Sequence, residues 1–313
     1  MECFYRSGSN PLRSRPGQPS KIKSLTARKT LMTSQDPLNK PFTIAQITDA
    51  HVGREIPFQR GLLDLCQQLE STVNHLNRLD PKPELLVFTG DIVNHGKSED
   101  YQRVKTLLTE LQMPCYLAVD NHDHRGRLQT VFSSHHYLHQ MDGFIQYVIE
   151  DHPIRIVVLD TLAPGSHHGH LCRRRLEWLD STLRAAPQVP TIIFMHHPPF
   201  VTGMPYPDRL GLDNHQPLAD IITTHPQVEA VASGHTHREA TLRWQGSVAY
   251  ITPSCAFSYG LEFNPVDDLD PLLEPPACRL FRWTPGVGLV SHLSYIGSYD
   301  LGLTEGFPPP PSA

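Results

Sequence analysis

Residues 42–51 read Phe-Thr-Ile-Ala-Gln-Ile-Thr-Asp-Ala-His, a mostly apolar run that ends in two side chains able to bind metal. A short, nearly continuous apolar run with β-branched residues is typical of a strand that is buried on both faces. Asp49 and His51 stand two residues apart, so on an extended strand end they point to the same side. This stretch therefore predicts a buried strand that carries two metal ligands at its end.

Apolar runs of the same kind recur along the chain and alternate with amphipathic stretches. The amphipathic stretches, residues 58–79, 99–111 and 174–186, carry apolar side chains at three- and four-residue spacing, which predicts helices. Strand, helix and strand in succession predict an α/β domain. The further apolar runs are residues 85–89, 115–119, 154–159, 191–195 and 228–232.

The C-terminal part has a different pattern. Residues 248–252, 279–283 and 289–296 read as strands with no strong helix between them. We therefore expect a β-rich C-terminal part that adds strands to a second sheet or builds a cap.

Polar clusters follow four of the later runs as well as the first. In open α/β sheets, ligands bind outside the carboxyl ends of the strands. Five strand ends would thus bring metal-binding side chains to one edge of one sheet. The four later clusters are Gly90-Asp91, Asp120-Asn121-His122-Asp123, His196-His197-Pro198 and Gly234-His235-Thr236-His237.

Each cluster has an ordinary structural explanation when it is taken alone. An Asp after a strand is usually a helix cap or a turn former, and a lone His usually binds nothing. Five clusters, each at a strand end, favour a shared metal centre instead. The predicted ligands are Asp49, His51, Asp91, Asn121, His196, His235 and His237.

The predicted ligands indicate both the metals and the reaction. Imidazole, carboxylate and amide groups without cysteine suit Fe, Mn, Zn or Co and do not choose among them. Two divalent ions with two carboxylates and a bridging hydroxide leave a charge of about +1, which attracts a singly charged phosphodiester. Such a centre would supply a metal-bound hydroxide as nucleophile. We expect His122 to donate a proton to the leaving alkoxide or a hydrogen bond to a phosphoryl oxygen, with Asp123 fixing its tautomer.

Taken in order, these motifs resemble the signature of the calcineurin-like metallophosphoesterases over roughly residues 41–300. Finer features are similar to class III cyclic-nucleotide phosphodiesterases and the related bacterial glycerophosphodiesterases. They are Gly90-Asp91-Ile92-Val93-Asn94, Phe194-Met195-His196-His197-Pro198-Pro199 and Asp213-Asn214.

The resemblance implies a two-sheet α/β sandwich flanked by helices, with a C-terminal β-rich cap or extension. It also implies at least a dimer. By the same resemblance, Asn94, Asn121 and His122 contact substrate, and we add His197, with a supporting role, to the substrate-binding residues. The first metal would be held by Asp49, His51, Asp91 and His237, and the second by Asp91, Asn121, His196 and His235.

Asp120 departs from the family pattern, which has glycine before the Asn-His pair. Glycine at such a place serves a backbone with positive φ or a close approach to the site. A carboxylate there also adds negative charge beside the metals, worth on the order of 3 kcal/mol per unit charge at about 6 Å. The substitution therefore raises the alternative that turnover is impaired.

The predicted function is hydrolysis of a small phosphodiester, either a 3′,5′-cyclic nucleotide such as cyclic AMP or a glycerophosphodiester. The choice between them is expected in the loops at residues 201–216 and 257–273, where Tyr206, Tyr259 and Phe263 stand. The alternatives are a phosphomonoesterase or protein phosphatase, and a catalytically impaired metal-binding scaffold.

Charge and composition limit the partners and the compartment. Residues 1–40 hold eight Lys or Arg against two acidic residues, whereas the whole chain carries −5. The remainder is therefore acidic, which argues against nucleic acid as a partner. No stretch approaches the roughly 20 apolar residues of a membrane span, and six cysteines without CxxC pairing favour a cytoplasmic location.

The predicted domains are a disordered basic extension at residues 1–40, within which Met32 is an alternative start, and a catalytic domain at residues 41–255. C-terminal strands and a substrate cap follow at residues 256–300, and a Pro-rich tail at residues 301–313.

Overall fold

The structure is a computed structural model that describes residues 40–58 and 61–299. The predicted Pro-rich tail, and all of the predicted basic extension except its last residue, lie outside the described residues.

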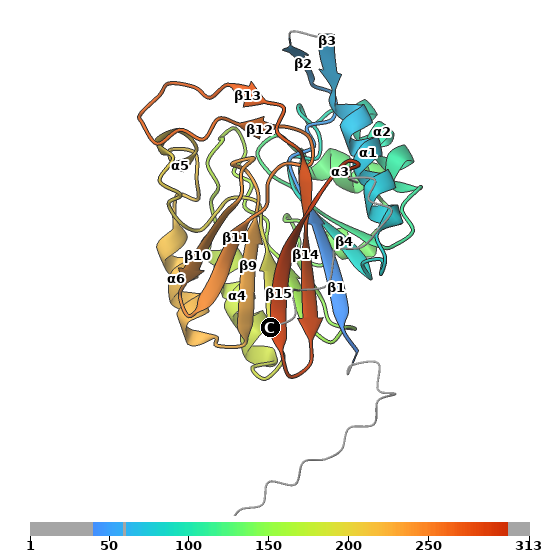
Figure 1. The fold of residues 1–313 in the computed structure, drawn as a ribbon. Coiled ribbons are helices and arrows are strands. Elements are labelled where there is room, and N and C mark those ends of the chain that lie inside the picture. Colours follow the sequence, from blue (N-terminus) through green and yellow to red (C-terminus); the bar gives the residue numbers. More distant parts are fainter. Residues whose placement is uncertain (1–39, 59–60, 300–313) are drawn as a thin grey trace, which may run out of the picture. The chain divides into compact units, whose positions relative to one another are not determined.

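Two sheets form the centre of the described chain (Figure 1). The five-stranded sheet has the order β15 (Gly288–Tyr295), β14 (Ala277–Thr284), β1 (Phe42–Ile47), β4 (Leu85–Thr89) and β5 (Cys115–Ala118). The six-stranded sheet has the order β10 (Ala240–Trp244), β11 (Ser247–Ile251), β9 (Val228–Ser233), β8 (Thr191–Phe194), β7 (Arg155–Val158) and β6 (Tyr147–Ile149).

The parallel strands in the middle of each sheet are the apolar runs of the sequence. Strand β1 pairs in parallel with β4, and β4 with β5, while β7, β8, β9 and β11 form a second parallel set. Their near-complete burial explains why these strands read as continuous apolar runs. Strand β14 joins the first sheet antiparallel to β1, so the C-terminal strands extend that sheet.

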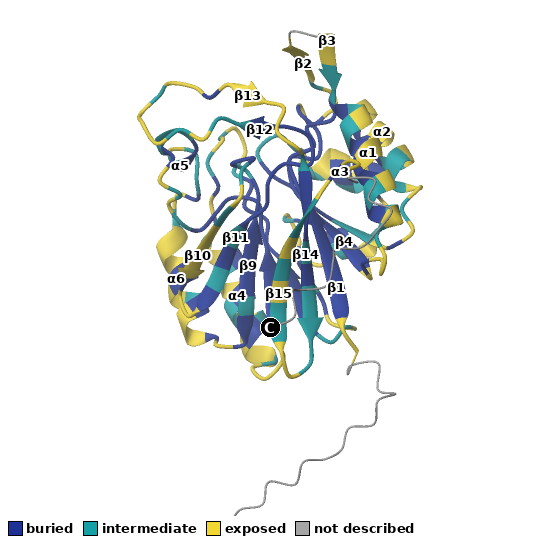
Figure 2. Ribbon diagram, in the orientation of Figure 1, coloured by how far each residue is buried: buried dark blue, intermediate teal, exposed yellow. Residues whose placement is uncertain are grey.

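The two sheets pack face to face, and helices cover their outer faces (Figure 1). Phe194 of one sheet meets Phe281 of the other, with ring centroids 5.7 Å apart. Figure 2 shows the buried strands between helices whose outer sides are exposed. The two-sheet sandwich predicted from the sequence is confirmed. The helices are α1 (Leu65–Arg78), α2 (Ser98–Leu108) and α3 (Arg125–Val131) on the first sheet, and α4 (Arg173–Ala185) and α6 (His215–Thr224) on the second.

The helix predicted over residues 58–79 begins later than expected. Its first part is a hairpin of β2 (Glu55–Phe58) and β3 (Gly61–Asp64). The Asp64 carboxylate accepts a hydrogen bond of 2.9 Å from the Cys66 amide and so caps the helix that follows.

Short elements complete the described chain. The β12–β13 ribbon lies within the predicted cap, whereas β14 and β15 belong to the sandwich. The boundary at residue 255 between the catalytic domain and the C-terminal part stays a prediction. Among the described residues, no helix combines the length and the apolar character needed to cross a membrane. These elements are α5 (Pro205–Asp208), the 3₁₀ helix η2 (His136–His139), β12 (Ser258–Tyr259) and β13 (Pro271–Leu272).

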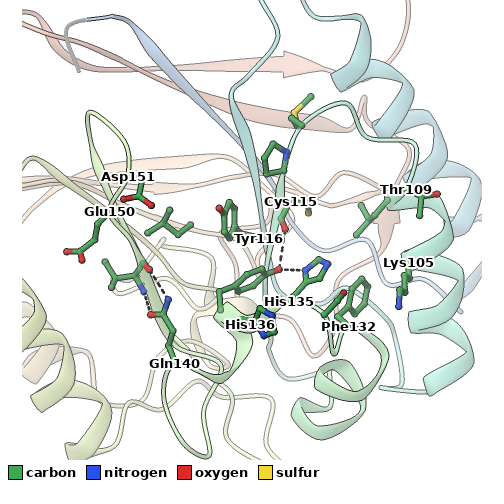
Figure 3. Close-up of a pocket in the computed structure, with 17 residues that line it drawn as sticks. Lys105, Thr109, Cys115, Tyr116, Phe132, His135, His136, Gln140, Glu150 and Asp151 are labelled. Carbon is green, nitrogen blue, oxygen red and sulfur yellow. Dashed lines mark hydrogen bonds between the residues drawn. The ribbon is translucent and has the colours of Figure 1, made fainter. Parts of the chain in front are cut away.

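A hollow with a volume of about 960 Å³ lies between α2, β5, η2 and β6 (Figure 3). We call it the aromatic groove. Its lining includes Lys105, Cys115, Tyr116, Phe132, His135, His136, Tyr137, Gln140, Glu150 and Asp151.

Candidate metal centre

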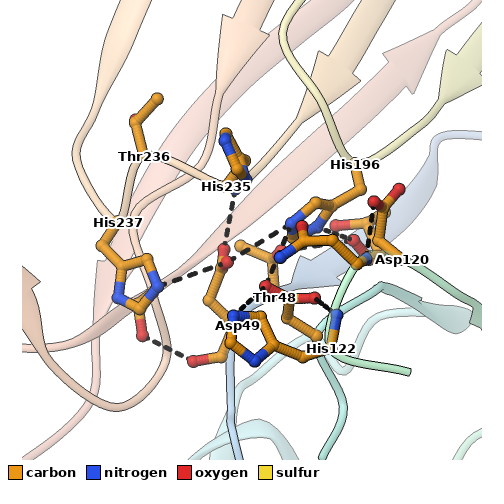
Figure 4. Close-up of polar contacts among 12 residues, drawn as sticks. Thr48, Asp49, Asp120, His122, His196, His235, Thr236 and His237 are labelled. Atoms are coloured by element: carbon orange, nitrogen blue, oxygen red, sulfur yellow. Dashed lines mark hydrogen bonds and ion pairs between the residues drawn. The ribbon is translucent and has the colours of Figure 1, made fainter. Parts of the chain in front are cut away.

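All seven predicted ligands lie just beyond the carboxyl ends of five parallel strands. Strands β1, β4 and β5 supply four of them from one sheet, and β8 and β9 supply three from the other. The prediction of one edge of one sheet is therefore wrong in this respect, because the cluster spans both sheets. Figure 4 shows Asp49, His196, His235 and His237 converging from the two sides.

The first ligand group is centred on Asp49. The Nε2 atoms of His51 and His237 lie 3.1 Å apart, and His237 Nε2 lies 3.4 Å from Asp49 Oδ1. Asp91 Oδ2 lies 3.6 Å from His51 Nε2, so Asp91 borders this group as well. Three side chains with ligand atoms this close are the arrangement that a single cation would hold together.

The second ligand group shares Asp91 with the first. Asp91, His196 and His235 place ligand atoms within 4.8 Å of one another, and His196 Nε2 lies 3.3 Å from Asp91 Oδ2. A third set of His51, Asp91 and His122 satisfies the same distance limit. Asp91 therefore lies close to ligand atoms of both groups.

Buried atoms without a partner show that these residues fit divalent ions. Asp49 Oδ1, Asn121 Oδ1 and His196 Nε2 are buried and have no hydrogen-bond partner. Leaving such an atom unpaired costs about 1–3 kcal/mol. All three belong to predicted ligands, and a cation would satisfy each of them.

Hydrogen bonds to backbone carbonyls fix two of the ligand rings. Nδ1 of His196 lies 2.8 Å from the Thr89 oxygen, and Nδ1 of His237 lies 2.9 Å from the Phe257 oxygen. A carbonyl only accepts, so each Nδ1 carries a hydrogen, and in the neutral ring each Nε2 has a lone pair that faces the cluster. This is the usual support of a metal-binding histidine.

The backbone of the ligands is strained. Among the described non-glycine residues, φ is positive at five predicted ligands and at Gln245 of the β10–β11 turn. Positive φ is uncommon outside glycine, and such residues cluster at functional sites. The five ligands are Asp49, His51, Asp91, His235 and His237, with φ between 46° and 72°.

Burial and charge set the protonation of the cluster. Burial holds the pKa of His51 and of His235 well below the ordinary value, so both rings are neutral. Burial alone would raise the pKa of Asp91, but the His196 and His122 rings outweigh it and hold that pKa well below its usual range. Burial alone would lower the pKa of His196, but the Asp91 and Asp120 carboxylates outweigh it and hold that pKa well above the ordinary value. Metal binding needs neutral imidazoles and ionised carboxylates, so His51, His235 and Asp91 are ready to bind an ion, whereas His196 would release a proton as it binds.

His122 lies at the edge of the cluster and borders the cavity above it. Its ring Nε2 is 4.0 Å from Asp91 Oδ2, and a quarter of its side chain is exposed. Its Nδ1 lies 2.9 Å from the Asn94 carbonyl oxygen, which fixes the tautomer with hydrogen on Nδ1.

The predicted contact between Asp123 and His122 is wrong. The Asp123 carboxylate accepts hydrogen bonds from the Ile92 and Val93 amides and from the Tyr101 hydroxyl. Asp123 is thus occupied in holding the loop after β4, and the Asn94 carbonyl takes the place predicted for it.

Two predicted substrate contacts lie behind the ligands. His197 has no exposed surface, so a direct contact between its side chain and substrate is excluded. Asn94 is buried, and its side-chain amide lies beside the neighbouring His95. Its carbonyl acts through His122, while a substrate contact by its side chain stays a prediction.

Asp120 does not have the backbone that the family glycine led us to expect. It is absent from the described residues with positive φ. Its carboxylate is fully buried and accepts hydrogen bonds from the Thr161 hydroxyl and the backbone amide of Asn121. Its Oδ1 lies 3.0 Å from His197 Nδ1. Burial raises the pKa of Asp120, but His197 and His196 outweigh it, so Asp120 is ionised beside His197.

A small cavity of about 150 Å³ opens above the metal cluster. Tyr206 and Tyr259 line it as the loop positions suggested, whereas Phe263 is not among its lining residues and is 63% exposed. The sequence analysis missed His167, which also lines the cavity. The only signal for it was the histidine-rich stretch at residues 167–170.

Comparisons with known proteins identify the family of the chain. A profile of the calcineurin-like phosphoesterases matches residues 42–239. A probable glycerophosphodiester phosphodiesterase of Arcobacter nitrofigilis is 33% identical, over 82% of this chain and 94% of its own. A probable cyclic nucleotide phosphodiesterase of Rhodopseudomonas palustris is 31% identical, over 74% of this chain and 84% of its own.

Among solved structures, a dimetal phosphatase from Danio rerio has the same fold, with a TM-score of 0.56 and 16% identity. The match covers 84% of this chain and 100% of that one. The family match and the phosphodiesterase relatives confirm the predicted enzyme class, a metal-dependent phosphoric diester hydrolase. The chain belongs to the calcineurin-like phosphoesterase family.

Proposed function

We propose that this chain hydrolyses a small phosphodiester at a dinuclear centre of Fe, Mn, Zn or Co. The observation that carries the proposal is the position of Asp91 between two groups of ligand atoms. Atoms of three predicted ligands, Asp49 Oδ1, Asn121 Oδ1 and His196 Nε2, are in addition buried without a partner. The proposed ligands are Asp49, His51, Asp91 and His237 for one ion, and Asp91, Asn121, His196 and His235 for the other. When bound, the two ions supply a hydroxide nucleophile and neutralise charge on the phosphoryl oxygens.

The protein's own residues position the diester and deliver a proton. His122 keeps hydrogen on Nδ1 through the Asn94 carbonyl, so its Nε2 faces the cavity. In its protonated form, Nε2 gives its proton to the leaving alkoxide oxygen as the P–O bond breaks. The products are an alcohol and a phosphomonoester, and proton donation of this kind contributes roughly 10²–10⁴-fold to rate.

Glycerophosphodiesters are the favoured substrates. The cavity of about 150 Å³ is smaller than the roughly 300–1,000 Å³ of sites that enclose drug-sized ligands. A glycerophosphodiester with a small alcohol suits this space better than a nucleotide does. Cyclic nucleotides are the second candidate, because the Tyr206 and Tyr259 rings line the same cavity and offer faces on which a base can stack.

The surroundings of Asp120 support an active enzyme over the impaired scaffold. The carboxylate lies against His197, with three hydrogen-bonding groups around it, so its charge is compensated where it is buried. A dimer and a cytoplasmic location remain predictions.

A parallel assay tests the proposal. Full-length protein supplied with Mn²⁺ is given glycerophosphocholine, cyclic AMP, bis(p-nitrophenyl) phosphate and p-nitrophenyl phosphate. We expect the diesters to be hydrolysed with a higher kcat/KM than the monoester, and glycerophosphocholine faster than cyclic AMP. A monoester preference would overturn the diesterase assignment, whereas faster cleavage of cyclic AMP would overturn only the order of the two diesters.

A further inference from the structure

A chain of hydrogen bonds starts at Asp120 and returns, through His197 and His167, to the side chain of the neighbouring Asn121. The backbone amide of Asn121 donates to Asp120 Oδ1 at 2.7 Å, and His197 Nδ1 lies 3.0 Å from the same oxygen. The Thr161 hydroxyl donates to the other oxygen of Asp120. Since Asp120, Thr161 and His197 are fully buried, this group has one well-defined arrangement.

His197 carries the arrangement forward into the loop at residues 161–169. Its Nε2 lies 2.9 Å from the His167 carbonyl oxygen, so this nitrogen donates. The absence of a side chain at Gly169 makes the contact possible, because a Cβ there would lie 2.4 Å from the His197 ring. The loop is closed at its base by a bond of 2.9 Å from the His170 amide to the Thr161 oxygen.

The chain of hydrogen bonds ends at the Asn121 side chain. Asn121 Nδ2 lies 3.2 Å from His167 Nδ1. An amide nitrogen only donates, so the His167 ring accepts at Nδ1. This contact turns Nδ2 toward the loop, and Oδ1 is the side-chain atom left buried without a partner.

We propose that Asp120 is a positioning residue. Together with Thr161 it holds His197, and His197 anchors the 161–169 loop. The anchored loop places His167 where it orients the side-chain amide of Asn121. His167 directs Oδ1 toward the second ligand group and leaves its own Nε2–H facing the cavity, where a substrate oxygen would lie. The carboxylate that replaces glycine is thus part of the centre's support. This inference rests on the proposed function, because it assigns Asn121 to the second ion.

Titration of the metal-free full chain with Mn²⁺ alone tests the inference without turnover. His167→Ala removes the acceptor of the Asn121 amide from an exposed loop, and we expect the second Mn²⁺ to bind about 10-fold more weakly. His167→Asn restores an acceptor at the δ position and should recover most of this loss. His168→Ala is the matched control, since His168 pairs with Asp213 at 3.0 Å and does not line the metal cavity.

A double-mutant cycle tests the role of Asp120. Asp120→Asn keeps the shape of the side chain and should weaken the second Mn²⁺ several-fold. If Asp120 acts through His167, the variant that combines Asp120→Asn with His167→Ala binds no more weakly than His167→Ala alone. A direct electrostatic effect of Asp120 on the ion would instead make the two losses add, which overturns the inference.

Two further outcomes separate the inference from the proposed function. Wild-type affinity for the second Mn²⁺ in His167→Ala overturns the inference while the dinuclear centre stands. Failure of the wild type to bind a second Mn²⁺ overturns the dinuclear centre, and the inference with it.

Discussion

The aromatic groove and the metal centre are both hollows in the described chain, but they differ in volume and in how far their polar atoms are paired. The groove has about 960 Å³ and the cavity above the metal centre about 150 Å³. In the groove the polar groups satisfy one another: the Tyr137 hydroxyl lies 3.2 Å from the Cys115 oxygen and 2.9 Å from His135 Nδ1 (Figure 3). None of the described groove residues has a buried side-chain polar atom without a partner.

The metal centre is small, but buried atoms of Asp49, Asn121 and His196 are unpaired and the backbone has positive φ at five predicted ligands. Size and aromatic lining are the usual guides to a binding site, and here they point to the groove. Unpaired ligand atoms and positive φ point instead to the small cavity. In this chain, unpaired atoms of the predicted ligands together with positive φ favour the small cavity over the larger groove as the candidate site.

The most severe test of this contrast is Asp91→Asn. Asp91 borders both ligand groups, and an amide cannot replace a bridging carboxylate. We expect kcat/KM for a diester to fall by at least about 1,000-fold, since single electrostatic contacts at an active site are worth 10²–10³. Tyr137→Phe in the groove is the control, with unchanged turnover. Equal losses in the two variants would refute the contrast.

His122→Ala comes next in size. It removes the proposed proton donor and leaves the predicted ligand atoms of both groups in place, so we expect kcat to fall about 100-fold. The number of Mn²⁺ ions bound per chain should stay that of the wild type. Loss of a bound ion in this variant would show that His122 is itself a ligand, as its proximity to His51 and Asp91 allows.

Removal of the metal should lower the stability of every variant whose metal centre is intact. At Mn²⁺ 100-fold above its Kd, binding stabilises the folded state by about 2.7 kcal/mol. For a chain of this size that raises Tm by roughly 4–5 °C, measurable by scanning fluorimetry with and without Mn²⁺ after chelation. Tyr137→Phe should show the same rise as the wild type, and Asp91→Asn little of it. A rise that persists in Asp91→Asn would place the ion elsewhere.

The smallest effect is expected from His135 of the groove. Burial and the Lys105 charge lower its pKa below the ordinary 6.5, so the folded protein resists protonating it. Stability from this group is complete above pH 6.5 and is lost as pH falls through the lower folded-state pKa. Between pH 7.5 and 5.5, Tm should therefore fall less in His135→Gln than in the wild type, with kcat/KM at pH 7.5 unchanged. Parallel pH slopes would contradict this.

The sequence predicts the parallel strands and their polar ends because burial on both faces leaves a local signature. Strands β1 and β4 match their apolar runs at both ends. The pairing of β14 with β1 joins residues more than 200 positions apart and has no such signature. The start of α1 was also misplaced, because leucines in the β2–β3 hairpin continue the helical spacing while Asp64 sets the cap.

The candidate site shows the same division. The ligand types could be read from the sequence because each follows a strand directly. The support of those ligands could not, since it depends on contacts between loops: His122 meets the Asn94 carbonyl, and Asp120 meets His197. His167 was missed because nothing near it in the sequence shows that its loop returns to Asn121.

The left-handed backbone of the ligands sets stability against function. Each such residue costs on the order of 1–2 kcal/mol relative to an ordinary conformation, and glycine at the same place would be nearly free of that cost. Glycine at His51 or His235 would relax the metal-free fold while removing a ligand. Selection for folding alone would therefore erode this centre. The histidines and aspartates at these positions therefore cost folding stability, and the proposed metal centre gives a reason for them.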